Sequence, residues 1–216
     1  MPQIFHKSAN ALARVSIVLG LGTLAGLVWA GATISTSGYV TGEDVVISQP
    51  VPFSHDHHFK GLGIHCLYCH TTVEESAFAG IPPTETCMNC HKEIWTNAEL
   101  LEPLRESYRS GIPIEWERLH DTPDYVYFNH SVHIAKGIGC ESCHGRVDEM
   151  PLMIQAESLT MAWCLDCHRD PAQHVRPREE IYTFGWVPPI PQSELGPQLV
   201  EEYEIQSVTN CSACHY

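Results

Sequence analysis

Cys66-Leu67-Tyr68-Cys69-His70 is the first of five copies of a Cys-x-x-Cys-His motif in this chain of 216 residues. The spacing is typical of covalent attachment of a c-type haem, in which two thiols form thioethers to the vinyl groups and the next histidine binds the iron. The five copies use all ten cysteines of the chain, which are Cys66, Cys69, Cys87, Cys90, Cys140, Cys143, Cys164, Cys167, Cys211 and Cys214. The motif histidines are His70, His91, His144, His168 and His215.

Zinc ribbons and redox-active dithiols are the two other classes of site that use Cys-x-x-Cys. Zinc ribbons do not require a histidine after each second cysteine, and redox dithiols seldom occur five to a chain. We therefore predict a pentahaem cytochrome c with five covalently bound c-type haems, whose irons take their proximal ligands from the motif histidines.

The length of the chain limits how it can fold around five haems. Without roughly the first 42 residues, about 174 remain, or about 35 for each haem. That is too little protein to build an ordinary apolar core and also to enclose each porphyrin. We predict a mainly irregular, small-α fold of short helices and loops in which the haems form the core, and the 15 glycines and 15 prolines agree with it.

The formal net charge is −14 with neutral histidines. An acidic surface argues against nucleic acid as a partner. It favours basic partner proteins or burial in a complex, and a solvated acidic surface of the kind common in secreted bacterial proteins explains it equally well.

An apolar segment near the N-terminus predicts a membrane anchor. His6, Lys7 and Arg14 precede an uncharged stretch over 15–42, and its most apolar part is 15–34. As a helix, this part spans about 30 Å, the thickness of one bilayer core. Because the basic end stays in the cytoplasm, we expect a single pass through the bacterial cytoplasmic membrane, with the haem domain on the periplasmic side.

A cleaved signal peptide is the alternative, with Ala30-Gly31-Ala32 as its cleavage site. The apolar run is longer than the roughly 7–15 residues of a signal peptide, which favours a retained anchor. Gly20, Gly22 and Gly26 have a small-residue spacing that suits close packing on a neighbouring membrane helix.

Two segments, 53–91 and 128–168, repeat one pattern. Each begins with Phe-x-His-x-x-His and continues through two Cys-x-x-Cys-His motifs, so we interpret them as homologous dihaem modules. The predicted divisions are 1–42 (cytoplasmic N-terminus and anchor), 43–92 (first module), 93–127 (linker), 128–175 (second module) and 176–216 (extended proline-rich segment with the fifth haem). We expect a helix within 98–109 of the linker and a polyproline II conformation around Pro188 to Pro197.

The repeated histidines predict distal ligands for four haems. An offset of three residues places both imidazoles on about one side of a helical turn but facing different directions. One can then bind the module's own first haem and the other a neighbouring haem. The four are His55, His58, His130 and His133. His57 and His65 do not recur in the second module, and we interpret them as ordinary polar residues.

The fifth haem receives no histidine from the repeat. Candidates for its distal ligand are His120, His174, Met88, Met150, Met153 and Met161. A thioether ligand raises the reduction potential relative to bis-histidine ligation, which would place a high-potential haem at the exit of a low-potential series. We rank Met150 first, then Met161, then His120.

A multihaem reductase needs an iron with an open distal position and acid–base groups around it. Here every motif keeps its histidine, and the chain has enough histidines and methionines to fill all the distal positions. We predict no catalytic residues and expect an electron carrier that is not an enzyme by itself.

Long strings of this sequence carry a family resemblance. In the first module they are Pro52-Phe53-Ser54-His55, the run from Cys66 through His70-Thr71-Thr72-Val73-Glu74-Glu75 and Ala79-Gly80-Ile81-Pro82-Pro83-Thr84, and Cys87-Met88-Asn89-Cys90-His91. In the second they are His120-Asp121-x-Pro123-Asp124-x-Val126-Tyr127-Phe128-Asn129-His130 and Cys143-His144-Gly145-Arg146-Val147-Asp148-x-Met150-Pro151. With these strings, most of 50–180 resembles the pentahaem cytochrome c subunit, ActA, of bacterial alternative complex III, as does the N-terminal anchor.

The resemblance implies a membrane complex that oxidises quinol, usually menaquinol, in a respiratory or photosynthetic chain. This subunit would relay electrons from an iron–sulfur, molybdopterin-like subunit to a monohaem cytochrome c subunit, beside polytopic quinol-binding subunits. The final acceptor would be a cytochrome c, a copper protein or a terminal oxidase. Most haems would be bis-histidine and at least one His/Met.

Two other functions compete with this expectation. The first is a stand-alone, membrane-anchored multihaem quinol dehydrogenase that feeds a periplasmic reductase, against which the fifth haem and the proline-rich tail weigh. The second is a haem-bearing reductase enzyme.

Overall fold

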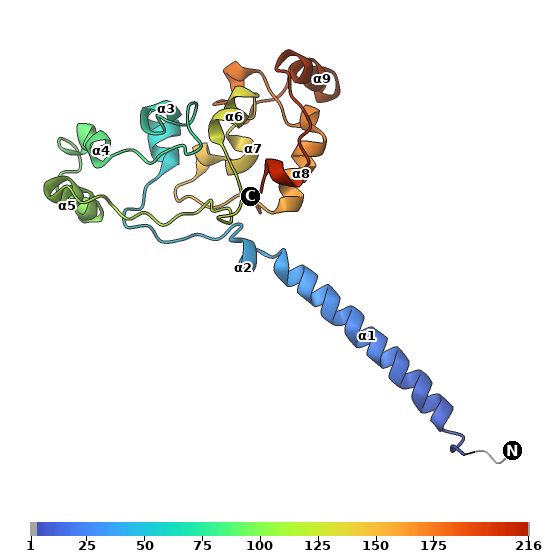
Figure 1. The fold of residues 1–216 in the computed structure, drawn as a ribbon. Coiled ribbons are helices and arrows are strands. Elements are labelled where there is room, and N and C mark those ends of the chain that lie inside the picture. The colour runs from blue at the N-terminus through green and yellow to red at the C-terminus, as the bar shows by residue number, and fades with distance from the viewer. Residues whose placement is uncertain (1–3, 216) are drawn as a thin grey trace. The chain divides into compact units, whose positions relative to one another are not determined.

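The computed structural model describes residues 4–215. The chain divides into two compact units, Met1–Gly42 and Glu43–Tyr216, and Figure 1 colours both along the chain.

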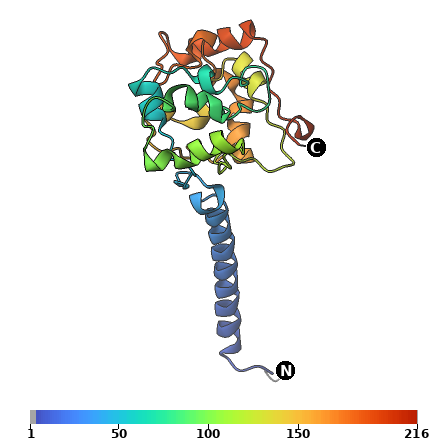
Figure 2. The same cartoon turned by 90° about the vertical axis from the view of Figure 1, so that its left-hand side faces the viewer.

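The first unit contains the helix α1 (Ala9–Ser35) and the short helix α2 (Gly38–Thr41). Figure 2 shows α1 as one continuous helix. Its 27 residues have a mean hydropathy of 1.9, and none of them is buried. A helix that is apolar all round is typical of a membrane span. By length and composition α1 can cross a membrane, and a signal sequence has the same properties.

The second unit consists of short helices joined by loops, which agrees with the predicted fold class. The longer helices are α4 (Thr84–His91), α5 (Glu102–Ser110), α6 (His130–Ala135), α8 (Met161–Arg169) and α9 (Gln192–Glu202). The shorter ones are η1 (Asp56–Gly61), α3 (Cys66–Cys69), η2 (Glu99–Leu101), α7 (Glu141–His144), η3 (Val147–Glu149), η4 (Pro171–Gln173), η5 (Arg178–Glu180) and η6 (Cys211–Ala213). Within residues 4–215, extended segments pair only in isolated bridges such as Val126–His215.

Each Cys-x-x-Cys-His motif forms a helical turn. The motifs lie on α3, α4, α7, α8 and η6 in chain order. Residues three apart on a helix face the same side. Both cysteines of a motif are therefore presented together, as attachment to one porphyrin requires.

The apolar core of the described residues is limited to two small clusters. Val51, Met88, Leu101 and Leu104 form one, and Val175, Leu199 and Tyr203 form the other. A domain of this length ordinarily buries much more apolar surface. The prediction that haems fill the interior accounts for the shortfall.

The helix predicted within 98–109 is present as η2 followed by α5. Pro103 lies in the first turn of α5, where its missing N–H has no partner to lose. Leu104 packs in the first core cluster. Arg105 and Arg109 on the helix surface pair with Glu102.

The extended conformation predicted around Pro188 to Pro197 is wrong over its second half. Residues 192–202 form α9, with Pro197 inside the helix. Leu195, Leu199 and Tyr203, spaced four apart, turn one apolar face onto Val175. Burial of such side chains contributes about 1.5–3 kcal/mol each, which offsets the roughly 3 kcal/mol cost of an interior proline. The sequence analysis did not predict this helix because the prolines of the segment favoured an extended conformation.

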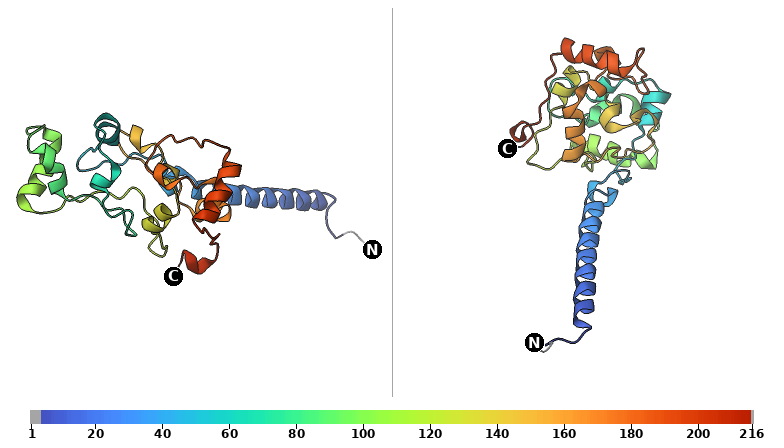
Figure 3. Two further views of the ribbon diagram at one scale, coloured as in Figure 1. Left: turned by 90° about the horizontal axis from the view of Figure 1, so that it is seen from above. Right: turned by 90° about the vertical axis from the view of Figure 1, so that its right-hand side faces the viewer.

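The elements of the second unit follow one another along its length. Figures 1 and 3 show α4 and α5 at one end, then α3, then α6 and α7, with α8 and α9 at the other end. The order in space therefore differs from the order in sequence, because the first motif, on α3, lies between the second and the third.

Candidate haem-binding sites

Four pairs of histidine rings face each other across a similar gap. The pairs are His55–His70 (centroids 6.4 Å apart, planes at 6°), His58–His91 (6.2 Å, 59°), His130–His144 (6.3 Å, 9°) and His133–His168 (6.1 Å, 72°). With a metal–nitrogen bond of about 2 Å, two imidazoles on opposite sides of one metal atom have centroids roughly 6 Å apart. Each pair thus joins one repeat histidine to one motif histidine at the spacing that two axial ligands of one iron require.

A phenylalanine orients both repeat histidines in each module. Phe53 packs edge-on against His55 (4.8 Å, 83°) and stacks on His58 (4.3 Å, 24°). Phe128 packs against His130 (4.8 Å, 89°) and His133 (4.7 Å, 24°) in the same way. The sequence repeat is therefore also a repeat of side-chain geometry. The phenylalanines were visible in the sequence pattern, but their contacts with the imidazoles were not predicted.

Backbone carbonyls hold most of these imidazoles through Nδ1. The Nδ1–O distances are 2.7 Å for His58 to Ser54, 2.8 Å for His133 to Asn129, 2.7 Å for His130 to Ala77, 2.8 Å for His70 to Gly80 and 3.1 Å for His168 to Val208. A carbonyl can only accept, so Nδ1 carries the proton. The lone pair of Nε2 is then free to bind a metal.

Three other Nδ1 atoms have a different environment. His144 Nδ1 lies 3.1 Å from Nε2 of His120, so its partner is a side chain. The Nδ1 atoms of His55 and His91 are buried and have no hydrogen-bond partner in the described part of the chain. The sites therefore differ in the hydrogen-bond acceptor at Nδ1, and this acceptor affects how strongly an imidazole donates electrons to a metal.

Burial favours the neutral form of two of the facing imidazoles, His144 and His55. The pKa of His144 is lowered to about 3, mainly by burial and then by the nearby His120 and His130. The pKa of His55 is lowered to about 4, again by burial first and then by His70. Neutral histidine is the form that binds a metal.

The cysteine thiols of different motifs lie close enough to influence one another. Burial and then the thiol of Cys69 raise the pKa of Cys87, and burial and then Cys66 raise that of Cys140 to about 11. For Cys143, burial and then Cys167 and Cys164 raise the pKa to about 12. Burial and then Cys214 raise the pKa of Cys164. The neighbouring pairs of motifs are second with first, first with third, third with fourth, and fourth with fifth.

Hydrogen bonds join three of these four neighbouring pairs, either at the motifs or through the segments beside them. Asn89 of the second motif donates to the Tyr68 hydroxyl of the first at 3.0 Å. His130 of α6 donates to Ala77, which follows the first motif. Ser207, ahead of the fifth motif, donates to the carbonyl of His168 at 2.7 Å. Among the described residues, the five motifs therefore neighbour one another in the order second, first, third, fourth, fifth.

Two comparisons with known proteins find sequences similar to this chain. Residues 126–216 match the family model described as cytochrome c7 and related cytochrome c. Over 97 residues the chain is 35% identical to the protein of Nitratidesulfovibrio vulgaris named "Menaquinone reductase, multiheme cytochrome c subunit". Over these segments the chain is therefore similar to multihaem cytochromes c. The second match covers 44% of this chain and 45% of the relative, so the chain spans about half the length of the relative.

The fifth motif is held by the segment that precedes α6. Tyr127 N donates to Cys214 O at 2.7 Å, and His215 Nδ1 donates to Tyr125 O at 3.4 Å. Within residues 4–215, the ring neighbour of His215 is Tyr125 (5.7 Å, 35°) and not a second imidazole. The distal ligand of this site stays a prediction.

The candidate ligands for that site lie in different places. Met88 packs in the first core cluster. The methyl group of Met150 lies beside Gly145, the residue that follows His144 in the sequence. The backbone carbonyl of Met150 accepts a hydrogen bond from Asp56 N at 3.1 Å. Met161 is 65% exposed and begins α8, three residues before Cys164. His174 and Met153 are half-buried.

His57 and His65 have local contacts. The ring of His57 packs against Trp95 and His58. His65 accepts a hydrogen bond from Leu67 N at 3.3 Å and so caps α3. Neither lies opposite a motif histidine as the four repeat histidines do.

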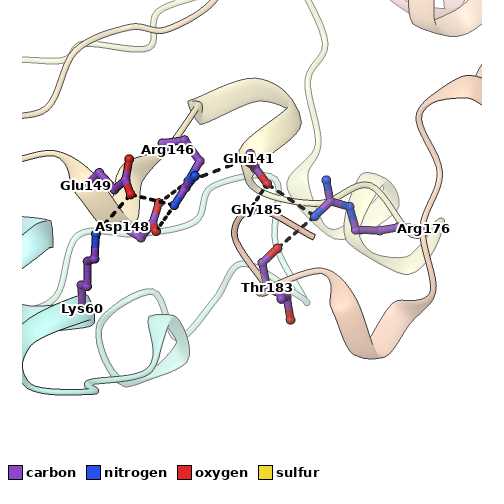
Figure 4. A network of polar contacts seen from close by, with 8 residues as sticks. All are labelled: Lys60, Glu141, Arg146, Asp148, Glu149, Arg176, Thr183 and Gly185. Atoms are coloured by element: carbon purple, nitrogen blue, oxygen red, sulfur yellow. Dashed lines mark hydrogen bonds and ion pairs between the residues drawn. The ribbon is translucent and has the colours of Figure 1, made fainter. Parts of the chain in front are cut away.

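A polar network fixes the first module to the second. Arg146 donates twice to the buried Asp148 at 2.8 and 2.7 Å and pairs with Glu149, which also pairs with Lys60 of η1 (Figure 4). The hydrogen bond from Arg146 lowers the pKa of Asp148. Glu141, beside Cys140, accepts from Gly185 N at 2.9 Å. Of these residues, the sequence analysis named only Arg146 and Asp148, as part of a family string, because nothing local predicts the partners in this network.

Proposed function

We propose that this cytochrome is the electron-transfer subunit of a membrane quinol-oxidising complex, the pentahaem ActA subunit of an alternative complex III. It would relay electrons from an iron–sulfur subunit through five c-type haems to a cytochrome c or copper-protein acceptor. The four facing imidazole pairs carry the haem-relay part of this proposal. When bound, the haems supply one-electron redox chemistry.

The residues of the chain hold those haems by two kinds of bond. The ten motif cysteines attach the porphyrins, and the motif histidines supply the proximal ligands. The distal ligands of the first four sites are His55, His58, His130 and His133, opposite His70, His91, His144 and His168 respectively. With both axial positions filled, these sites have no place for a substrate, which supports an electron carrier that is not an enzyme by itself.

For the fifth site we propose a methionine opposite His215. Met161 and Cys164 are three apart on α8 and so face one side of the helix, and the thiol of Cys164 neighbours that of Cys214. Met150 lies instead beside the third motif. Met161 is therefore better supported than Met150, which the sequence ranked first.

The series of attachment sites supports a relay between two ends. One end is the second motif on α4, and the other is the fifth motif on η6. Each repeat helix holds two neighbouring sites, since η1 follows His55 and contains His58, and α6 contains both His130 and His133. The protein thus fixes the spacing of consecutive sites through single turns of helix.

The membrane and quinone parts of the proposal rest on α1 and on the relative. α1 would be a single-pass anchor, with the second unit on the periplasmic side, where c-type haem is attached. The relative's name links it to menaquinone and describes it as a subunit. We infer partner subunits of the iron–sulfur, polytopic quinol-binding and monohaem cytochrome kinds.

A second candidate follows from the word reductase in the name of that relative. The same series of sites could carry electrons from a periplasmic donor to menaquinone. Assays of the purified complex with menaquinol and oxidised cytochrome c, and with menaquinone and reduced cytochrome c, distinguish the two directions.

Purification from native membranes tests the proposed function. We expect co-purification with iron–sulfur and polytopic subunits, and five c-type haems per chain by the pyridine haemochrome method. A chain that purifies alone and oxidises quinol by itself would overturn the proposal.

A further inference from the structure

His144 lies between two other imidazoles. On one side His130 faces it in a nearly parallel plane, 6.3 Å away between centroids. On the other side His120 meets it at 67°, with centroids 4.2 Å apart and 3.1 Å between His144 Nδ1 and His120 Nε2. His120 therefore contacts Nδ1 of His144, whereas His130 faces the His144 ring across a gap.

The chemistry of ligation decides the direction of this hydrogen bond. That direction rests on the proposed function, in which His144 binds iron through Nε2. The proton of a neutral imidazole that binds through Nε2 is on Nδ1, so His144 must donate and His120 Nε2 must accept. The lone pair of that His120 nitrogen is then occupied, so His120 cannot bind a second iron through it.

We propose that His120 is a positioning residue of the third haem site, which orients His144 and lowers the reduction potential there, and that it does not ligate the fifth haem. An imidazole nitrogen is a stronger acceptor than a peptide carbonyl. A stronger acceptor gives the donor ring more imidazolate character and makes it a better electron donor to ferric iron.

The other sites supply an internal comparison. Most of the facing imidazoles donate to carbonyls, while His55 and His91 have no acceptor within the described residues. Among the described ligand pairs, the third site alone has an imidazole acceptor. It is also in the middle of the series, between the first and fourth sites.

Three variants of the full-length cytochrome in its complex test this role. His120→Phe removes the acceptor and keeps an aromatic ring, His120→Gln replaces the nitrogen with a weaker amide oxygen, and His174→Phe is the matched control at a half-buried histidine. The measurements are haem content, a potentiometric titration of every haem, and the electron paramagnetic resonance (EPR) spectrum.

We expect His120→Phe to raise the potential of one haem. At the former midpoint of that haem, the ratio of oxidised to reduced form falls about tenfold, which is about 59 mV for a one-electron couple. The EPR signal of the same haem changes because His144 loses the contact that fixes its plane. His120→Gln gives a smaller rise, and His174→Phe gives none.

The outcomes separate this inference from the proposed function. Unchanged potentials and spectra in both His120 variants, with five low-spin haems, would refute the role of His120 and leave the ligand pairs standing. Loss of a distal ligand from the fifth haem in His120→Phe would show that His120 ligates it. A wild-type protein without bound haem, or with high-spin iron at the third site, would refute the proposed function itself. If His120→Phe does not accumulate, the absence of any shift in His120→Gln overturns the inference.

Discussion

The imidazole rings of His55 and His70 lie within 6° of parallel, with centroids 6.4 Å apart. Fifteen residues separate them in sequence, and one comes from the repeat while the other follows the two cysteines of the first motif. The equivalent pair in the second module, His130 and His144, lies at 9°. The second pair of each module is tilted instead, at 59° and 72°. In both modules, therefore, the first pair of imidazole rings is nearly parallel and the second pair is tilted.

This alternation predicts two classes of EPR signal. Parallel imidazole planes lift the near-degeneracy of the iron orbitals that they overlap, whereas crossed planes preserve it. We expect two rhombic low-spin signals from His55–His70 and His130–His144. Two signals with a single large g value should come from His58–His91 and His133–His168. Four bis-histidine haems of one spectral class would contradict this alternation of ring angles.

Removal of the His58 side chain should leave one haem iron without its distal ligand. His58→Ala deletes the imidazole opposite His91, so one haem should become high-spin and bind cyanide while the others do not change. His57→Ala is the control, because His57 is adjacent and exposed but faces Trp95. A low-spin spectrum in His58→Ala that does not respond to cyanide would exclude His58 as a ligand.

A methionine substitution should remove the His/Met absorption band of the fifth haem. Met161→Leu deletes the thioether with little change in volume, so the band near the red edge of the spectrum should disappear and the potential of that haem should fall. Met150→Leu is the matched control. The opposite result, with the band lost only in Met150→Leu, would restore the ranking that the sequence favoured.

The pair Arg146–Asp148 should make the free energy of unfolding depend on pH. The hydrogen bond from Arg146 lowers the pKa of Asp148 in the folded state, so its contribution is present above the ordinary pKa and is lost as the pH falls through the lowered value. We expect Asp148→Asn to lower the free energy of unfolding at neutral pH by about 1–2 kcal/mol, and to reduce the loss of stability in acid.

Asp121→Asn is the control for that measurement. Asp121 pairs with Arg118 on the surface, and such exposed pairs contribute little. Denaturant unfolding at neutral and acid pH checks both variants. Equal stability of Asp148→Asn and the wild type at neutral pH would show that the pair Arg146–Asp148 in Figure 4 contributes no net stability.

Local patterns in the sequence predicted the parts of this structure that depend on spacing alone. The Cys-x-x-Cys-His turns, the apolar helix at 15–34 and the helix within 98–109 all follow from residues close together in the chain. The histidine repeat predicted which four imidazoles would lie opposite motif histidines. It left open which of them faces which motif.

The remaining features depend on contacts between distant residues. His120 and His144 are 24 residues apart, and no local pattern joins them. The segment around Pro197 is helical because Leu199 and Tyr203 pack on Val175, a contact that outweighs the local preference of proline. The order of the attachment sites likewise arises from the way the two modules pack, with the first motif beside the third.

Near-infrared magnetic circular dichroism of the oxidised protein tests the central claim most directly, because this signal reports the pair of axial ligands on each low-spin haem. We predict bis-histidine and His/Met bands with integrated intensities in a ratio of about four to one. High-spin iron in the resting protein, or two or more His/Met haems, would contradict the assignment of His55, His58, His130 and His133 as distal ligands.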